Sequence, residues 1–151
     1  MDKHFELTDK FIINAFGIKL LQIKCTRKIK HADVGDLGGY IEKEDNLSGD
    51  AWVSGDAWVS GNAKVSGNAQ VSGDAKVSNN NEHCGFDCFG SANRHTHAYK
   101  TQSGKVEIIC GCFRGSIEEF EEQVKKTHQG NEFERQYMAI AEVIKIKLGL
   151  K

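Results

Sequence analysis

The sequence lacks the features that mark several common classes of protein. Its 20 Lys and Arg residues are balanced by 21 Asp and Glu residues, so there is no cationic excess with which to bind nucleic acid by bulk charge. No apolar run approaches the roughly 20 residues that span a bilayer, and no signal peptide opens the chain. The hydrophobic share of 39% is too high for a disordered chain. We therefore expect a folded cytoplasmic protein of about one domain, with no membrane partner and no bulk binding of nucleic acid.

Proline is absent, and cysteine is odd in number. The chain has no Pro, 16 Gly and five Cys. An odd cysteine count without an export signal argues against a disulfide framework and favours reduced thiols. Four of the cysteines lie within 29 residues of sequence, at Cys84, Cys88, Cys110 and Cys112. This clustering makes them possible metal ligands.

A six-residue repeat dominates the middle of the sequence. From residue 41 the chain reads IEKEDN, LSGDAW, VSGDAW, VSGNAK, VSGNAQ and VSGDAK. Position one is always aliphatic and, from the second hexad on, position five is always Ala. A period of six fits neither a helix nor an alternating strand, but it is typical of a parallel β-solenoid with Gly-Asp or Gly-Asn at the corners. The alternative is a Gly/Ser-rich linker, which does not need an aliphatic residue at every sixth place.

The hexads resemble the left-handed β-helix of hexapeptide-repeat proteins, in which three hexads close one coil. The resemblance implies two coils with residues 18 apart stacked, so that Trp52 lies over Gln70 and Trp58 lies over Lys76. Because position six faces outward, both Trp side chains are predicted on the outer walls. There they mark an interface or are covered by a flanking module. Two coils bury little apolar surface, so we expect a homo-oligomer, either a dimer or a trimer.

Two helices are predicted near the C-terminus. Ser116 and Glu119 form a capping box at the start of the first helix, which Gly130 ends. Asn131 caps the second helix, and we interpret the apolar stripes of both helices as core. Before them, residues 106–113 form an apolar run typical of a strand.

The predicted fold is mainly β with C-terminal helices. Residues 4–31 alternate in short runs, which predicts an antiparallel β pair with a turn near Phe16. The predicted modules are an N-terminal β module (1–40), a short left-handed parallel β-helix of about two coils (41–78) and a C-terminal αβ module with two helices (79–151).

The chain resembles a family of small hexapeptide-repeat proteins encoded by bacteriophages and prophages. The resemblance is carried by Gly-Asp-Leu-Gly-Gly-Tyr-Ile-Glu at 35–42, by the VSGNA-type hexads, and by Cys-Gly-Cys-Phe-Arg-Gly-Ser-Ile-Glu-Glu-Phe at 110–120. It covers nearly the whole chain and implies a setting in the cytoplasm of a bacterial host. In similar tails a Thr-rich stretch stands where this chain has His95, Thr96 and His97.

Three kinds of chemistry are open to such a sequence. Hexapeptide-type acyl transfer needs a general base, commonly His, near the coils, but no His lies between His31 and His83. A structural zinc site is possible, because Cys and His are its usual ligands, although buried Cys also packs as a small hydrophobe. The candidate zinc ligands are His83, Cys84, Cys88, His95, His97, Cys110 and Cys112. We expect that folding does not require a metal.

The third kind is an anion-binding pocket. Arg grips phosphate bidentately, and Ser, Thr and Asn give directional hydrogen bonds. Arg114 also lies beside the start of the first helix, whose free N–H groups favour an anion, while no P-loop is present. The candidate ligand-binding residues are Ser91, Asn93, Arg94, His95, Thr96, His97 and Arg114. The alternative is a polar loop with surface arginines.

The function predicted from these observations is that of a non-enzymatic phage protein without a cofactor. It binds and sequesters a small phosphorylated, nucleotide-like ligand to counter host defence signalling. The alternatives are an inhibitor that docks on a host defence protein and a hexapeptide-type transferase.

Overall fold

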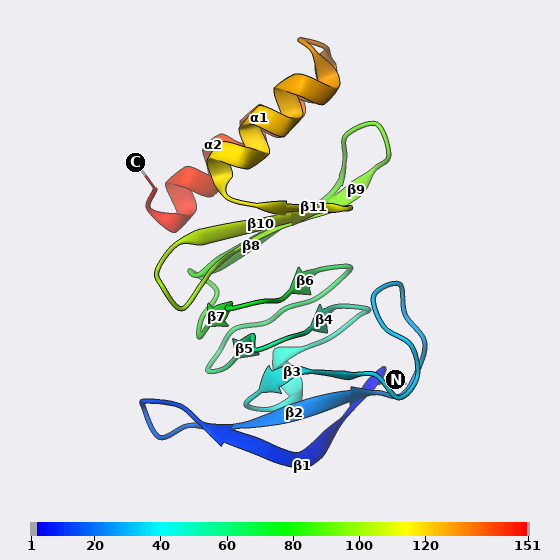
Figure 1. Cartoon of the computed structure of the whole chain (residues 1–151), viewed down its shortest axis with the longest axis vertical. Coiled ribbons are helices and arrows are strands. Elements are labelled where there is room, and N and C mark those ends of the chain that lie inside the picture. Colours follow the sequence, from blue (N-terminus) through cyan, green and yellow to red (C-terminus); the bar gives the residue numbers. More distant parts are fainter. Residues whose placement is uncertain (1–2, 151) are drawn as a thin grey trace. The chain divides into compact units, whose positions relative to one another are not determined.

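The computed structural model describes residues 3–150, and it divides into two compact units. The first unit ends at Asn80 and the second begins at Asn81. The predicted N-terminal β module and the hexads therefore lie together in the first unit. Both units contain β-sheet, and the two α-helices belong to the second (Figure 1).

The first unit begins with three strands that pair antiparallel. They are β1 (Phe5–Ile13), β2 (Lys19–Cys25) and β3 (Leu37–Ile41). The pair predicted over residues 4–31 is thus confirmed, with a turn that contains Gly17 at a positive φ of 80°. A short 3-10 helix, η1 (Glu44–Asn46), then leads into the hexads.

The hexads form four strands of two residues each. They are β4 (Trp52–Val53), β5 (Trp58–Val59), β6 (Gln70–Val71) and β7 (Lys76–Val77). Residues 18 apart pair in parallel, so the predicted register of Trp52 with Gln70 and of Trp58 with Lys76 is confirmed. The aliphatic and Ala positions are buried, and the corner glycines have φ between 59° and 65°, which favours Gly because a Cβ is strained there. These glycines are Gly49, Gly55, Gly61, Gly67 and Gly73.

The prediction of a left-handed β-helix of about two coils is wrong as a fold class. The hexad strands belong to a mixed five-stranded sheet of order β1-β2-β3-β5-β7 and to a two-stranded sheet of β4 and β6. A third parallel pairing, between Leu47 and Val65, forms only an isolated bridge and no strand. The physical reason is that the hexad strands leave an edge open at β3, which pairs in parallel with β5. Strand β2 pairs antiparallel with this edge, so the hexad strands become part of a larger mixed sheet. Mainly β remains the correct description of the chain.

The two Trp side chains have different environments. Trp52 is only 4% exposed, because the His4 ring lies 6.3 Å from its ring and Gly38 lies against it. A Cβ at Gly38 would come within 2.8 Å of the Trp52 ring, so glycine is required at this close approach. Trp52 is therefore covered by N-terminal residues, which is the second of the two alternatives that the sequence left open. Trp58 is half-buried and remains a candidate for an interface.

The second unit is a four-stranded antiparallel sheet with two helices. The sheet order is β11-β10-β9-β8, and Figure 1 shows both helices on one side of it. The strands are β8 (His83–Phe89), β9 (Arg94–Lys100), β10 (Val106–Cys110) and β11 (Phe113–Gly115). The strand predicted over residues 106–113 is in fact interrupted at Gly111, whose φ of 59° turns the chain into an antiparallel pair.

Both predicted helices are confirmed, and their caps are the ones the sequence indicates. Helix α1 (Ile117–His128) starts with the capping box of Ser116 and Glu119, and helix α2 (Glu132–Leu148) is capped by the Asn131 side chain. Their buried faces pack on the sheet to form one core, which includes Ala98, Ile108, Phe120, Ile140 and Ile144. Neither helix is long and apolar enough to cross a membrane.

Candidate functional site

Strand β9 divides the predicted site residues between two faces of its sheet. Successive side chains of a strand point to opposite faces. Thr96 lies on the face that packs against the helices, where its hydroxyl donates to Sγ of Cys110 at 3.2 Å. His95 and His97 lie on the other face, where they hydrogen-bond to each other at 3.1 Å. The structure therefore does not place the predicted anion-binding residues in one pocket.

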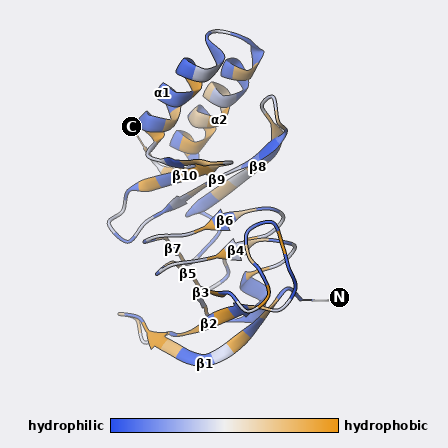
Figure 2. Cartoon of the chain, turned by 45° about the vertical axis from the view of Figure 1, so that its right-hand side comes forward, coloured by the Kyte–Doolittle hydropathy of each residue, from blue (hydrophilic) through white to orange (hydrophobic). Residues whose placement is uncertain are grey.

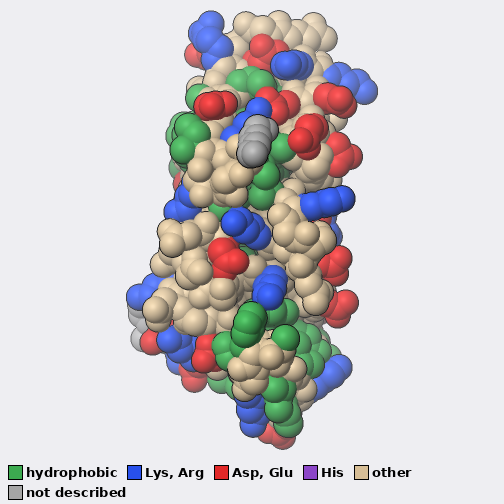
Figure 3. Space-filling model, turned by 90° about the vertical axis from the view of Figure 1, so that its left-hand side faces the viewer, with side chains coloured by type: hydrophobic (Ala, Val, Ile, Leu, Met, Phe, Trp, Pro, Cys, Tyr) green, Lys and Arg blue, Asp and Glu red, His purple; other side chains and the backbone are tan. Residues whose placement is uncertain are grey.

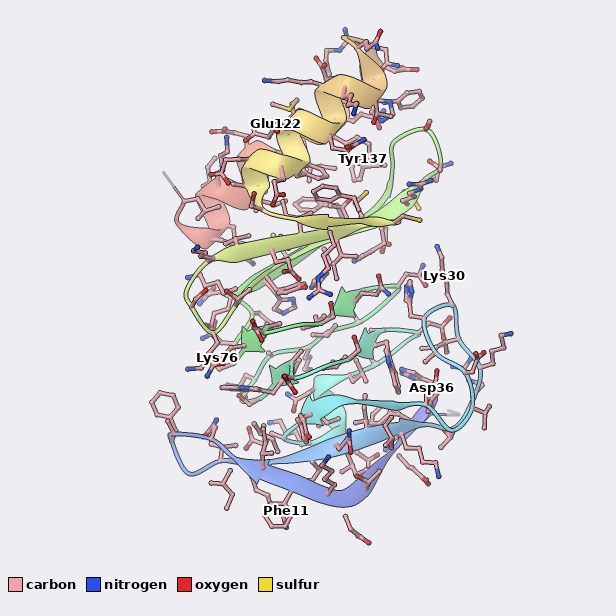
Figure 4. All side chains as sticks on the ribbon, viewed as in Figure 1. Phe11, Lys30, Asp36, Lys76, Glu122 and Tyr137 are labelled. Carbon is pink, nitrogen blue, oxygen red and sulfur yellow. The ribbon has the colours of Figure 1, made fainter. Side chains whose placement is uncertain are left out.

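A pocket lies on the helix side of this sheet. Its cavity volume is about 470 Å³, within the range of about 300–1,000 Å³ typical of small-molecule sites. Phe113 from β11, Phe120 from α1 and Tyr137 from α2 give it aromatic walls. The rings of Phe113 and Phe120 lie 5.6 Å apart, and those of Phe120 and Tyr137 lie 5.7 Å apart. Figure 4 labels Tyr137, which lies between the helices and the sheet.

Arg94 brings a positive charge to this pocket. Its guanidinium lies over Gly111, where a Cβ would come within 2.6 Å of Nη1. Among residues 3–150, no carboxylate pairs with Arg94, and no Asp or Glu lines the pocket. The His128 ring, stacked on Tyr137 at 5.7 Å, also lines it. The pocket therefore combines a cation that has no ion pair in this part of the chain with aromatic walls.

The inner end of the pocket holds a chain of hydrogen bonds that runs in one direction. The Thr96 hydroxyl donates to Cys110, the Cys110 thiol donates to the Tyr137 hydroxyl at 3.7 Å, and that hydroxyl donates to the backbone carbonyl of Phe89 at 3.3 Å. Burial, with the neighbouring Cys110, raises the pKa of Tyr137 to about 12. Tyr137 is therefore a neutral hydroxyl at physiological pH. Gly90 leaves the space for this hydroxyl, because a Cβ there would overlap it.

The opposite face of the sheet carries a chain of histidines that ends on a carboxylate. His83 Nδ1 lies 3.1 Å from His97 Nε2, and His97 Nδ1 lies 3.1 Å from His95 Nε2. His95 Nδ1 lies 2.5 Å from Oδ1 of Asp87. The rings lie close to β8 because a glycine, Gly85, pairs with His97. A Cβ at Gly85 would come within 2.7 Å of His97 Nδ1.

Burial keeps two of these histidines neutral. It is the largest cause that lowers the pKa of His83 to about 4, and the positive charge of Lys147 adds to it. Burial also holds the pKa of His97 well below its ordinary value, with His83 and His95 as further causes. Burial therefore disfavours the cationic form of His97 that its predicted role in binding phosphate needs.

The other predicted ligand-binding residues have separate places. Nε of Arg114 donates to Oε1 of Glu107 at 2.7 Å, and the hydroxyl of Tyr99 donates to the same oxygen. Arg114 is thus an ion-paired residue, although it borders the pocket. Ser91 and Asn93 lie exposed in the turn between β8 and β9, where Asn93 has a φ of 49°. Arg94 is therefore the predicted residue whose charge the pocket itself can use.

The predicted zinc ligands do not converge on one point. Cys110 is buried in the helix-side core, Cys84 is half-buried, and Cys88 and Cys112 are exposed. Within residues 3–150 there is no group of three or more His, Cys, Asp or Glu side chains placed to hold a metal ion. The nitrogens of His97 instead face one neighbouring histidine each.

Sequence reasoning missed the aromatic walls of the pocket. Phe120 and Tyr137 lie on the apolar stripes of the two helices, and we interpreted both stripes as core. The one signal in the sequence is Tyr137 on the stripe of the second helix. A buried tyrosine hydroxyl needs a hydrogen-bond partner, which indicates a polar site within the core.

No family model, curated protein or solved structure matches the chain. The resemblance to phage-encoded hexapeptide-repeat proteins therefore stays a prediction.

Proposed function

We propose that the second unit binds a small ligand that combines a flat ring with a phosphate group, and that it holds this ligand without converting it. The observation that carries the proposal is Arg94, a guanidinium without an ion pair among the described residues, at a pocket with no carboxylate in its described lining. A charged group of this kind favours an anion, and the planar fork of Arg matches a phosphate bidentately.

The aromatic walls support the flat part of the ligand. Phe113, Phe120 and Tyr137 offer ring faces and edges to the cavity, and aromatic surfaces bind planar rings by stacking or edge contacts. A nucleotide has both a flat base and a phosphate. We therefore take nucleotide-like ligands as the class to test.

The hydrogen bonds at the inner end of the pocket favour binding over turnover. The thiol of Cys110 and the hydroxyl of Tyr137 donate along one chain that ends at a backbone carbonyl. A backbone carbonyl takes up no proton under these conditions, so the hydrogen-bonded groups Thr96, Cys110 and Tyr137 have no base at their end to activate a nucleophile. His128 is the side chain in the pocket lining that could act as a base, and recovery of the bound nucleotide tests whether it does. In the phage setting that the resemblance implies, such binding would sequester a host signalling nucleotide.

The test is calorimetry of the purified full chain against a panel of linear and cyclic nucleotides. We expect one nucleotide class to bind and to be recovered unchanged. A charge-assisted hydrogen bond contributes about 1.5–3 kcal/mol, so Arg94→Ala should weaken binding roughly ten- to hundredfold. The matched control is Arg135→Ala, which removes an exposed arginine of α2 that does not line the pocket.

Two results would overturn the proposal. Equal affinity of the parent and Arg94→Ala would remove Arg94 from the site. Recovery of a converted nucleotide would favour an enzyme instead. If no nucleotide binds and a host protein co-purifies through this unit, the interpretation as a protein-docking inhibitor takes its place.

A further inference from the structure

The far half of the β1–β2 hairpin exposes a group of apolar side chains. This group, the hairpin patch, consists of Phe11, Ile13 and Phe16, which are 48%, 63% and 75% exposed. Figure 2 shows the corresponding end of β1 as a hydrophobic stretch, and Figure 3 shows hydrophobic side chains gathered in the lower part of that view. Contiguous exposed apolar groups of this kind mark an interaction site more often than scattered single ones do.

Strand register explains why these side chains lie outside the core. Phe11 pairs with Leu21 and Ile13 pairs with Lys19, whereas Ile12 pairs with the buried Leu20. Phe11 and Ile13 therefore lie on one face of the hairpin and Ile12 on the other. Strand β3 pairs with β2 only between Leu21 and Lys24, so no third strand lies beside the far half of the hairpin. In Figure 4 the labelled Phe11 points away from the ribbon. Strand β1 is also an edge of its sheet.

Lysines lie within the hairpin patch itself. Nζ of Lys19 lies 4.5 Å from the centre of the Phe11 ring, and Nζ of Lys76 lies 5.2 Å from the centre of the Phe16 ring. The same Lys76 nitrogen lies 5.3 Å from the ring centre of Trp58. From residue 10 to residue 24 the sequence has three lysines and no carboxylate. The patch is therefore apolar and cationic at once.

Several backbone groups at the tip of the hairpin are hydrogen-bonded internally, although Nδ2 of Asn14 has no partner among the described residues. Oδ1 of Asn14 accepts from the N–H of Phe16 at 2.9 Å and from that of Ile18 at 3.0 Å. The carbonyl of Asn14 accepts from the N–H of Gly17, and its own N–H donates to the carbonyl of Ile18. These groups keep their partners when water is removed, which lowers the cost of placing the tip in an apolar medium.

We infer that the hairpin patch docks on an anionic lipid surface, with Ile13 and Phe16 entering the boundary between headgroups and acyl chains. Apolar side chains supply burial there, while Lys19 and Lys76 meet anionic headgroups. We expected no membrane partner because the sequence has no membrane-spanning segment. A contact with the membrane surface does not need such a segment.

The test is flotation of the full chain with vesicles of phosphatidylcholine, with and without phosphatidylglycerol. We expect binding only to the anionic vesicles, and weaker binding as salt is added. Ile13→Ser and Phe16→Ser should each weaken it about tenfold, and Lys19→Gln about fivefold. The matched control is Ile146→Ser, which removes an isoleucine that is 73% exposed on α2 in the other unit. All four variants change exposed side chains, and thermal unfolding should show them folded.

Absence of binding to anionic vesicles would overturn the inference. So would equal binding to neutral vesicles, or an equal loss in Ile146→Ser. Light scattering without lipid distinguishes lipid binding from self-association. Self-association that Ile13→Ser abolishes would show that the hairpin patch is an interface between copies of the chain instead. The hairpin variants should bind nucleotide as the parent does, so failure here leaves the ligand pocket unaffected.

Discussion

Arg94 lies over Gly111, and the missing side chain of that glycine is what allows the arginine to reach the pocket. A Cβ at Gly111 would come within 2.6 Å of Nη1 and 2.9 Å of Cδ of Arg94. Strand β9 supplies the charge at the cationic end of the pocket, and the turn between β10 and β11 supplies the empty space beside it.

Gly111→Ala should therefore weaken ligand binding by displacing Arg94. It should also lower the free energy of unfolding by about 1–2 kcal/mol, because a φ of 59° is strained for any residue with a Cβ. Gly104→Ala is the control, since Gly104 has a φ of 83° with open space around it. Calorimetry and urea unfolding should show a similar loss of stability in both variants but a loss of affinity in Gly111→Ala alone. A similar affinity in the two would contradict the contact.

The histidine chain should make the second unit unstable in acid. The pKa of His83 is about 4 in the folded protein, against an ordinary value of 6.5, so the unfolded chain binds more protons between these pH values. The free energy of unfolding should then rise with pH across this window, by about 1.4 kcal/mol per pH unit for one such group. Burial lowers the pKa of His97 as well, so His97 acts in the same direction.

Urea unfolding at several pH values between about 4 and 7 measures this dependence. His83→Gln should flatten the profile, because it removes the proton that the unfolded chain takes up. An unchanged profile in His83→Gln would contradict this assignment of the acid loss to His83.

Ser116→Ala should destabilise helix α1. The Ser116 side chain accepts from the N–H of Glu119 at 3.2 Å, and Oε1 of Glu119 accepts from the N–H of Ser116 at 3.0 Å. Loss of such a cap costs about 1 kcal/mol, which chemical unfolding resolves. Ser91→Ala, in the exposed turn between β8 and β9, should leave the stability unchanged.

Trp52→Ser should strongly destabilise the first unit. Trp52 is 4% exposed, and truncation of a buried aromatic side chain costs about 3–5 kcal/mol. Trp58→Ser should cost less, because Trp58 is half-buried. Thermal unfolding of the two variants checks the order, and an equal loss would contradict the burial difference.

Local features of the fold were predictable, and the packing of distant segments was not. The capping residues Ser116 and Asn131 act on N–H groups two or three residues away, so sequence alone places both helix starts. The pairing of Trp52 with Gln70 followed from the regular spacing of the hexads. The covering of Trp52 by His4 depends on where the N-terminal strands pack, and no periodicity records that.

The candidate site was predictable only in part for the same reason. Arg94 and Arg114 both border the pocket, as expected for arginines among Ser, Thr and Asn side chains. The ion pair of Arg114 with Glu107, however, depends on the register of β10 against β11. His95 and His97 point away from the pocket because a strand alternates its side chains. The alternation predicts these directions only if residues 94–100 are known to form a strand, and the sequence did not predict one there.

The turn at Gly111 also gives the pocket a natural attachment point for a reporter group. Cys112 follows Gly111, is exposed and lines the pocket, whereas Cys110 is buried with its thiol donating to Tyr137. Thiol reagents react with accessible cysteines and spare buried ones. With exposed Cys88 replaced by Ser, a maleimide dye should label mainly Cys112, in the same pocket as Arg94. Ligand arrival could then be followed as a change in fluorescence, without a labelled ligand and before the ligand has been identified.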